Sequence, residues 1–191
     1  MRFGEFRRLV ASDLFRHAGR VDHRAFWYFF MLSPGFRYIF WLRLASWMGQ
    51  AGFVTRHLQY LSELVLRHYS IKYGMSIPHV TKIGPGFYIG HFGGIVVSGR
   101  CTIGRDCNIS QGVTIGQVNR GPRMGTPVIG DRVYFGPGAA VLGAVKVGSD
   151  VAIGANAVVL EDIPDHAVAV GAPARVVSLE GSEGYVENTG F

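Results

Sequence analysis

The sequence predicts a mainly β chain wound as a parallel solenoid of three-sided coils, preceded by a small helical region. An aliphatic or aromatic residue recurs every six positions from residue 77 almost to the end of the chain, often with a glycine after it. A period of six fits neither a helix nor a hairpin meander, but it fits a chain that turns a corner every six residues. Three short strands then complete one coil. The recurring residues are Ile77, Ile83, Ile89, Ile95, Val97, Ile103, Ile109, Ile115, Ile129, Phe135, Val141, Val147, Ile153 and Val159.

Residues 1–74 lack this period and are expected to form a separate helical region. Apolar residues at helical spacing predict an amphipathic helix over 3–17 that ends near Gly19. An aromatic run over 26–32 follows, and after a Pro-Gly pair a second apolar stretch covers 36–48. Neither stretch has the roughly 20 uninterrupted apolar residues that a membrane span needs.

The second stretch has a narrow polar stripe formed by Arg43, Ser46 and Gln50. Such a helix is either buried by neighbours in an oligomer or lies in a membrane interface with its arginines near the headgroups. Up to residue 75 the chain has eleven Arg and Lys against four acids, so peripheral membrane contact through residues 1–50 is one interpretation. Nucleic-acid binding is disfavoured, because apolar bulk interrupts the basic residues.

A further helix is expected over 55–73. Thr55 is a candidate N-cap and Gly74 a candidate end. Its apolar face is expected to consist of Leu58, Leu61, Leu64, Val65 and Tyr69.

The solenoid is expected over 75–178, with two irregularities. Eight positions instead of six separate Ile95 from Ile103, which predicts a local bulge there. A longer break predicts an outward loop over 116–128, where binding groups often lie. The acidic, glycine-containing segment 179–191 is expected to be a mobile C-terminal tail.

The two cysteines, Cys101 and Cys107, fall at small inward positions of the repeat. They are expected to be buried reduced thiols, with a disulfide or a nucleophile as the alternatives. The N-terminus has no apolar core followed by a small-residue cleavage site, so a cytoplasmic setting is expected, with contact at the inner face of the membrane as an extension of it.

Three segments carry a resemblance to a known family. They are Ile83-Gly84-Pro85-Gly86-Phe87-Tyr88-Ile89-Gly90-His91-Phe92-Gly93-Gly94-Ile95-Val96-Val97, Gln111-Gly112-Val113-Thr114-Ile115-Gly116 and Gly171-Ala172-Pro173-Ala174-Arg175-Val176-Val177. Together they resemble hexapeptide-repeat acyltransferases of the serine acetyltransferase type, and most of all those that O-acetylate polysaccharide precursors. The resemblance implies a left-handed parallel β-helix that forms a homotrimer, with active sites between subunits and acetyl-CoA as co-substrate.

The resemblance also implies roles for individual residues. His91 would be the general base that takes the proton from an acceptor hydroxyl, since imidazole can accept and return a proton near neutral pH. Gly116, Pro137 and Ala155 match CoA-lining positions, and Pro137 and Ala155 are one full coil apart, so they should share a wall. Arg175 would meet a CoA phosphate or act structurally. No metal is expected, because a zinc site would need three histidines at coil spacing.

Departures from the serine-specific pattern concern the acceptor. Ser76 and Gly90 stand where that type has acids, and Gly125-Thr126 stand where it has a histidine that helps to bind carboxylate. An amino-acid pocket must pair an ammonium and a carboxylate, and those partners are missing. The main interpretation is therefore acetyl transfer to a sugar hydroxyl of a capsular or exopolysaccharide precursor. The alternatives are a serine O-acetyltransferase of cysteine biosynthesis and a non-catalytic β-helix scaffold.

The group that orients His91 is left open, with Ser76, Asn108, Ser110 or a backbone carbonyl as candidates. Gln111 is expected one coil above His91, where it either lines the cleft or caps exposed backbone.

Overall fold

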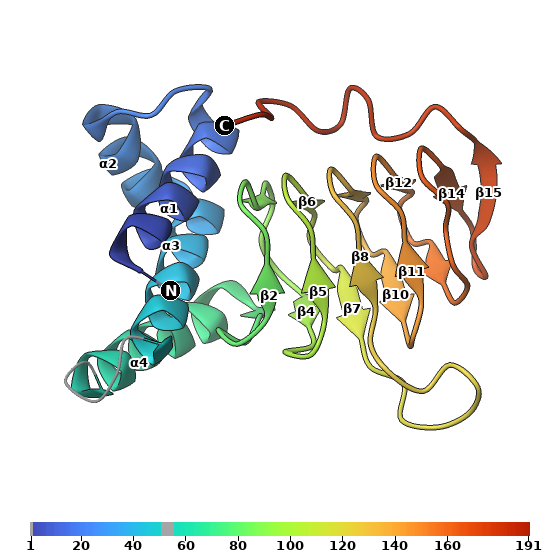
Figure 1. The fold of residues 1–191 in the computed structure, drawn as a ribbon, viewed down its shortest axis with the longest axis horizontal. Helices are drawn as coiled ribbons and strands as arrows, with labels where there is room; N and C mark the ends of the chain where they lie inside the picture. The colour runs from blue at the N-terminus through green and yellow to red at the C-terminus, as the bar shows by residue number, and fades with distance from the viewer. Residues whose placement is uncertain (1, 51–55) are drawn as a thin grey trace.

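The computed structural model describes residues 2–50 and 56–191. Within these residues four helices precede fifteen short strands (Figure 1). The helices are α1 (Phe3–Ala18), α2 (His23–Leu32), α3 (Pro34–Gln50) and α4 (Arg56–Tyr73). The strands are β1 (Met75–Ser76), β2 (Lys82–Ile83), β3 (Tyr88–Ile89), β4 (Ile95–Val97), β5 (Thr102–Ile103), β6 (Asn108–Ile109), β7 (Thr114–Gly116), β8 (Val128–Ile129), β9 (Tyr134–Phe135), β10 (Ala140–Leu142), β11 (Lys146–Val147), β12 (Ala152–Ile153), β13 (Val158–Val159), β14 (Val168–Val170) and β15 (Arg175–Ser178).

The strands stack into the three walls of a parallel β-helix. Sheet A has the order β1-β4-β7-β10-β13, sheet B the order β11-β8-β5-β2, and sheet C the order β15-β14-β12-β9-β6-β3. All pairs are parallel except β14 with β15, which run antiparallel and close the last coil. The residues of the six-residue period point inward and form one continuous core, because each short strand alternates its side chains between core and surface.

The irregular coil lies one corner earlier than the sequence predicts. Ile89 pairs with Ile109, twenty positions on, whereas Val97 pairs with Ile115, eighteen positions on. The two extra residues are therefore inserted in the turn over 90–94, between β3 and β4, and the predicted bulge between Ile95 and Ile103 is wrong. The sequence misleads here because Ile95 and Val97 are both buried.

The helix ends follow the sequence signals. Gly19 caps α1 in the left-handed region at φ 65°, and Gly74 ends α4 at φ 62°. The Asp22 side chain caps α2 by accepting from the Ala25 amide at 2.8 Å. The predicted N-cap Thr55 lies outside the described residues. No helix that the structure describes combines the length and the apolar character needed to cross a bilayer.

The apolar face predicted for α4 is mostly exposed. Leu58, Leu61 and Leu64 are 51%, 58% and 63% exposed, while α4 buries Ser62 and Leu66 instead. The prediction is wrong for these three leucines, whereas Val65 and Tyr69 of the predicted face are half-buried and Tyr69 packs against the core.

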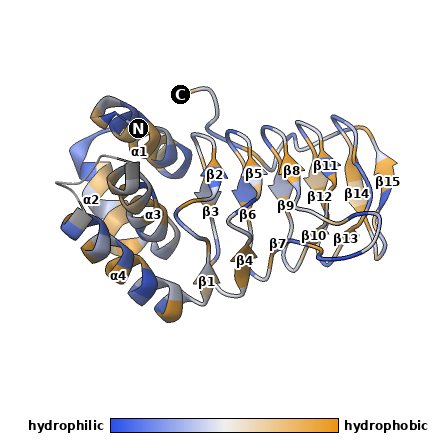
Figure 2. Ribbon diagram, turned by 60° about the horizontal axis from the view of Figure 1, so that its bottom comes forward, coloured by the Kyte–Doolittle hydropathy of each residue, from blue (hydrophilic) through white to orange (hydrophobic). Residues whose placement is uncertain are grey.

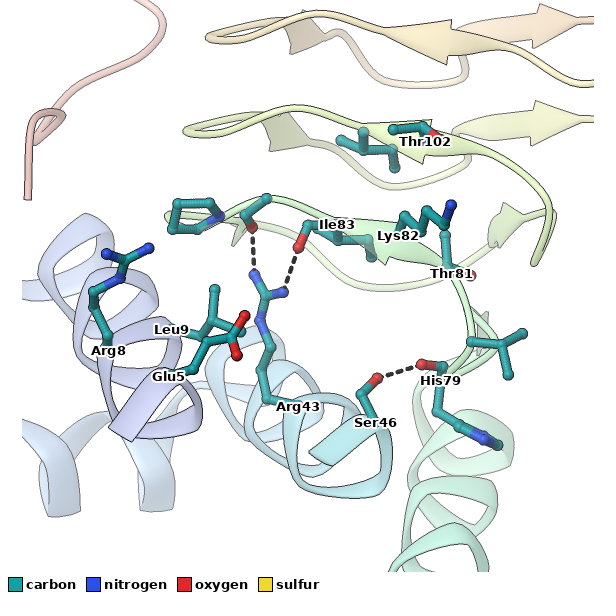
Figure 3. Close-up of a pocket in the computed structure, with 14 residues that line it drawn as sticks. Glu5, Arg8, Leu9, Arg43, Ser46, His79, Thr81, Lys82, Ile83 and Thr102 are labelled. Atoms are coloured by element: carbon teal, nitrogen blue, oxygen red, sulfur yellow. Dashed lines mark hydrogen bonds between the residues drawn. The ribbon is translucent and has the colours of Figure 1, made fainter. Parts of the chain in front are cut away.

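The polar stripe of α3 fastens the helices to the first coil. Arg43 donates to the backbone oxygens of Ile83 and Gly84, each at 2.6 Å, and Ser46 donates to the carbonyl of His79 (Figure 3). Arg43 also forms a buried ion pair with Asp13 of α1, at 2.8 Å between Nε and Oδ2. Arg43 is therefore buried by the chain itself and Ser46 is half-buried, and the polar atoms of both side chains are bound within the chain instead of being turned to lipid headgroups.

Residues 179–191, expected to form a mobile tail, lie back along sheet C and reach α1 (Figure 1). The Tyr185 ring stacks on Tyr134 of β9 at 4.5 Å, and its carbonyl accepts from Asn108 of β6 at 2.6 Å. Nearer the end, the carbonyl of Glu187 accepts from Arg16 of α1 at 2.7 Å. The tail therefore connects the last coil to the first helix.

Both cysteines are buried and unbonded to each other. Burial raises the pKa of the Cys107 thiol to about 12 and also raises that of Cys101. The predicted buried reduced thiols are confirmed.

Candidate active site at the corner between β3 and β4

His91 lies in the two-residue insertion between β3 and β4, with its side chain exposed. The glycines that follow it keep the surface beside it open. A Cβ on Gly93 would meet no atom within 4 Å, and one on Gly94 would lie 3.2 Å from the Cα of Gly112. Both adopt positive φ, 107° and 67°, a region that glycine occupies without strain. The corner thus presents an imidazole beside unobstructed backbone.

Residues of α3 and α4 contact this corner on the side of the helical region. Gly35 of α3 contacts β3 so closely that a Cβ there would lie 2.0 Å from the carbonyl oxygen of Ile89. The ring of Phe92, the residue after His91, lies 5.3 Å from the ring of Tyr73 at the end of α4. Arg37 of α3 donates to the Tyr73 hydroxyl at 2.8 Å. The strand before His91 and the residue after it are therefore both fixed by helical side chains or backbone.

On the other side of His91, an aromatic ring occupies the space beside Gly90. A Cβ on Gly90 would lie 3.0 Å from the Tyr88 ring, so this ring lies over the glycine. His17 of α1 packs on Tyr88 with ring centroids 4.5 Å apart. Burial lowers the pKa of His17, which keeps its imidazole neutral at physiological pH.

One of the groups suggested to orient His91 has other partners. Asn108 accepts from Arg16 at 2.5 Å and donates to the tail carbonyl of Tyr185. Ser110 is buried directly after β6, in the next coil. Ser76 is exposed on β1. In the described part of this single chain, no hydrogen bond or ion pair joins His91 to any of these candidates.

The residues predicted to line CoA fall on two edges of the β-helix. The amide of Asn156 donates to the Pro137 carbonyl at 2.8 Å, so Pro137 and Ala155 occupy successive coils of one column. The same column continues through Gln111 to Gly93, because the Gly138 amide bonds the Gln111 carbonyl and the Gly112 amide bonds the Gly93 carbonyl. Gln111 therefore lies one coil above Gly93, and not above His91 as the sequence predicts.

Gly116 lies away from this column, whereas Arg175 begins β15 beside Val170, next to the end of the column. Gly116 ends β7, opposite Leu142, at the corner where sheet A passes to sheet B. Arg175 is exposed on β15, with Nη1 3.5 Å from a Glu161 oxygen. The structure thus brings Pro137 and Ala155 onto the edge that carries His91 and places the Arg175 backbone beside Val170 at the end of that edge, but it places Gly116 on another edge.

The outward loop leaves a different edge from the one that carries His91. It begins after β7 of sheet A and ends at β8 of sheet B (Figure 1). Within it, Val118 and Gly125 are paired through two backbone hydrogen bonds. His91 lies where sheet C passes to sheet A. Within one chain the loop and His91 therefore lie at different corners, so a cleft containing both needs a neighbouring copy.

The structure adds residues that sequence reasoning missed. Phe92 could have been noted because it follows His91 directly, but nothing in the sequence connects it to Tyr73 or to Arg37. The described residues contain no cluster of three His, Cys, Asp or Glu side chains of the kind that holds a metal ion.

Comparisons with known proteins agree with this architecture. The family model for bacterial transferase hexapeptide (six repeats) matches residues 126–161. A serine acetyltransferase from Helicobacter pylori (strain J99) is 38% identical over 156 residues, which covers 81% of this chain and 87% of that protein. The serine acetyltransferase of Mycobacterium tuberculosis (strain H37Rv) is 37% identical over 144 residues, which covers 75% of this chain and 61% of that protein.

Solved structures of serine acetyltransferases superpose on most of this chain. A serine acetyltransferase in complex with CoA has a TM-score of 0.72 and 30% identity, and the match covers 92% of this chain and 70% of that one. Soybean serine acetyltransferase without ligand has a TM-score of 0.75 and 29% identity, covering 91% and 69%. The predicted fold class, a left-handed parallel β-helix preceded by a helical region, is confirmed.

Proposed function

Because this chain belongs to the serine acetyltransferase family of hexapeptide-repeat transferases and is thus an acetyl-CoA-dependent O-acetyltransferase, we propose that His91 is its general base. The observation that carries the proposal is the exposed imidazole in an insertion between β3 and β4, beside glycines that leave room for substrate. A repeat built for stability alone has no need of this insertion. Helical contacts on both sides of the corner support a defined position for it.

In the proposed reaction, neutral His91 removes the proton from an acceptor hydroxyl as that oxygen attacks the thioester carbon of acetyl-CoA. The carbonyl oxygen becomes an oxyanion, which backbone N–H groups of the glycine-rich corner could stabilise. The C–S bond then breaks, and protonated His91 returns the proton to the CoA sulfur. A general base of this kind typically contributes about 10²–10⁴-fold to the rate.

The column formed by Gly93, Gln111, Pro137 and Ala155 is the proposed track for the pantetheine arm. It begins beside His91 and runs along the coils, so an extended thioester could lie on it with its acyl group at the corner. Gly116, on another edge of the chain, would meet CoA bound to a neighbouring subunit. Arg175, beside Val170, would lie near the far end of the track. Arg175 forms an exposed ion pair with Glu161 at 3.5 Å. Its guanidinium would bind a CoA phosphate, or it would stabilise the hairpin formed by β14 and β15.

A homotrimer is the proposed assembly. Its support within this chain is that the outward loop and His91 occupy different corners of the β-helix. Neighbouring copies would bring the loop of one chain toward the His91 corner of the next. A cytoplasmic location, which the N-terminal sequence predicts, is proposed as well.

For the acceptor, the comparisons favour L-serine, the alternative in the sequence analysis, over a polysaccharide precursor. The relatives and solved structures described above are serine acetyltransferases. L-Serine is therefore the first acceptor to test.

A neutral sugar hydroxyl is the second candidate, and one specific observation favours it. Ser76 and Gly90 provide no carboxylate for an ammonium group, and the Tyr88 ring fills the space into which a side chain at position 90 would extend. A half-exposed phenyl group, Phe92, lies next to His91 instead. These groups suit an uncharged acceptor better than a zwitterion.

The decisive experiment measures thiol release from acetyl-CoA with L-serine and, separately, with methyl pyranosides of glucose, galactose, mannose and N-acetylglucosamine. His91→Ala should lower kcat by about 10²–10⁴-fold. His166→Asn is the matched control, because His166 is an exposed histidine at a distant corner with φ 58°, which asparagine tolerates.

Full activity of His91→Ala would overturn the assignment of the base. Turnover with L-serine alone would remove the sugar acceptor, and turnover with a pyranoside alone would remove L-serine. Failure of the wild-type protein to bind acetyl-CoA would leave the non-catalytic scaffold as the better description.

A further inference from the structure

α2 has two apolar sides, and only one of them is covered. Ala25, Phe26, Phe29 and Phe30 pack on α1 and α3 in a small core with Leu14 and Phe36. The opposite side, spaced by three and four residues, exposes Trp27 (59%), Tyr28 (60%), Met31 (63%) and Leu32 (65%). A ten-residue helix therefore presents four large apolar side chains to the outside. In Figure 2 the helices, α2 among them, lie at the end of the molecule opposite β15.

We propose that this exposed side of α2 docks on the surface of an anionic lipid bilayer. The inference is independent of the acceptor and goes beyond the proposed function. Tryptophan and tyrosine are the side chains that favour the boundary between headgroups and acyl chains, because they combine a large apolar ring with a polar atom. Met31 and Leu32 would enter the acyl boundary beside them.

The surrounding charge is complementary to anionic lipid. Arg24 is exposed one turn before Trp27 and Tyr28, and Arg20 is exposed in the connection that precedes α2. Among the described residues of the helical region, the exposed basic side chains are Arg2, Arg7, Arg8, Arg20, Arg24, Arg67 and Lys72. Asp13 is paired with buried Arg43, Asp22 forms an exposed pair with Arg20, and Glu63 lies 3.5 Å from His79, so Arg24 is the basic residue of α2 that lies beside the four apolar side chains.

The helix proposed to contact the membrane is α2, whereas the sequence suggested α3. The sequence pointed to the arginine-bearing stripe of α3, but Arg43 and Ser46 of that stripe bind the carbonyls of the first coil. α2 instead lies at the end of the molecule opposite β15 (Figure 1). In a trimer whose coils stack along a common axis, the three α2 helices would point to the same end.

The docking side of α2 is also linked to the catalytic corner. Arg37 donates to the carbonyl of Phe30 at 2.6 Å and to that of Met31, both in the last turn of α2. The same guanidinium bonds Tyr73, whose ring contacts Phe92 beside His91. A membrane bound to α2 would therefore be connected to the corner that carries His91 through Arg37, Tyr73 and Phe92.

The test is flotation of the full-length protein with vesicles of phosphatidylcholine alone or mixed with phosphatidylglycerol in equal parts. The wild-type protein should float with the mixed vesicles at low salt. Trp27→Gln/Met31→Gln/Leu32→Gln should reduce the bound fraction about tenfold or more. Raising the salt to about 1 M, where the Debye length is about 3 Å, should weaken binding as well.

The matched control removes the same number of exposed apolar residues from another helix. Leu58→Gln/Leu61→Gln/Leu64→Gln on α4 should leave flotation unchanged. Arg24→Glu alters only an exposed charge and should reduce binding to the mixed vesicles about fivefold or more, so it tests the proposal even if the α2 triple variant folds poorly.

Three results would overturn the proposal. They are no flotation of the wild-type protein, equal loss of flotation in the α4 control, and a lower oligomeric mass of the α2 triple variant by light scattering. The last would mean that the α2 side is an interface between copies of the chain. None of these results depends on catalysis, so His91→Ala can fail in the acetyl-transfer assay or succeed there independently.

Discussion

Replacing Asp13 by asparagine tests how the helical region is fastened to the β-helix. The Asp13 carboxylate is 1% exposed and its partner, the Arg43 side chain, 6%. The carboxylate accepts from Arg43 at 2.8 and 3.1 Å and from the Phe87 amide of the first coil at 2.8 Å. Asparagine keeps the shape but removes the charge, so the guanidinium loses its anion while it stays buried.

The expected cost follows from this geometry. Removing one partner of a buried ion pair costs about 3–5 kcal/mol, because the other charge stays buried without compensation. Arg43 keeps its bonds to the carbonyls of Ile83 and Gly84, so the lower end, about 3 kcal/mol, is expected. With a urea m-value of about 2 kcal/mol/M, the unfolding midpoint should fall by about 1.5 M.

Urea unfolding followed by two probes measures this effect. The three tryptophans, Trp27, Trp41 and Trp47, are all in the helices, so their fluorescence follows the helical region, while circular dichroism follows the whole chain. The double variant Asp13→Leu/Arg43→Met should recover part of the loss, because no charge is then left buried. A midpoint shift below about 0.3 M for Asp13→Asn would refute the reasoning, since it corresponds to an exposed pair.

Three other variants test the catalytic corner, the core and the tail. Gly35→Ala should cost about 1–3 kcal/mol and lower kcat about tenfold or more, because its Cβ would strike the Ile89 carbonyl, whereas Gly4→Ala, in open space, should stabilise by about 0.5–1 kcal/mol; equal melting temperatures would contradict this. Cys107, whose pKa burial raises from 9.0 to about 12, should resist iodoacetamide in the folded protein at pH 9. Its unfolded thiol ionises first, so stability should fall as the pH rises from about 9 toward 12, and Cys107→Ala should lack that component of an alkaline unfolding series. Deleting 179–191 should cost about 2–4 kcal/mol from lost stacking and hydrogen bonds, and unchanged thermal unfolding would show that the tail contributes nothing.

The solenoid could be predicted from the sequence because its determinants are local. Each corner repeats the same choice of a buried aliphatic residue and a small one, so Ile77 and its successors identify the fold without any long-range information. The position of the insertion could not be predicted in the same way. Ile95 and Val97 both point inward, and only the pairing of Val97 with Ile115 reveals that the extra residues surround His91.

The helical region shows what spacing leaves undetermined. The pattern gave the helices and the ends at Gly19 and Gly74, but not which side of each helix meets which neighbour. The exposed leucines of α4 and the buried Arg43 of α3 both depend on contacts between segments that are distant in the sequence.

In the candidate site, too, some residues could be predicted from the sequence and others could not. His91, Pro137 and Ala155 could be proposed as site residues because of the resemblance to a known family, and the one-coil spacing of Pro137 and Ala155 predicts that these two share a wall. The support from Tyr73 and Arg37 depends on tertiary contacts that leave no local signal.

The length of the C-terminal tail, residues 179–191, limits the number of coils that the β-helix can have. Between β15 and β3 sheet C has five strand spacings, which at about 4.8 Å each make about 24 Å. The nine residues 179–187 can span at most about 30 Å when fully extended. One added coil would stretch this segment almost to its limit, and two would separate Glu187 from Arg16. The length of the tail thus limits how far the repeat can grow by duplication before its two ends lose contact.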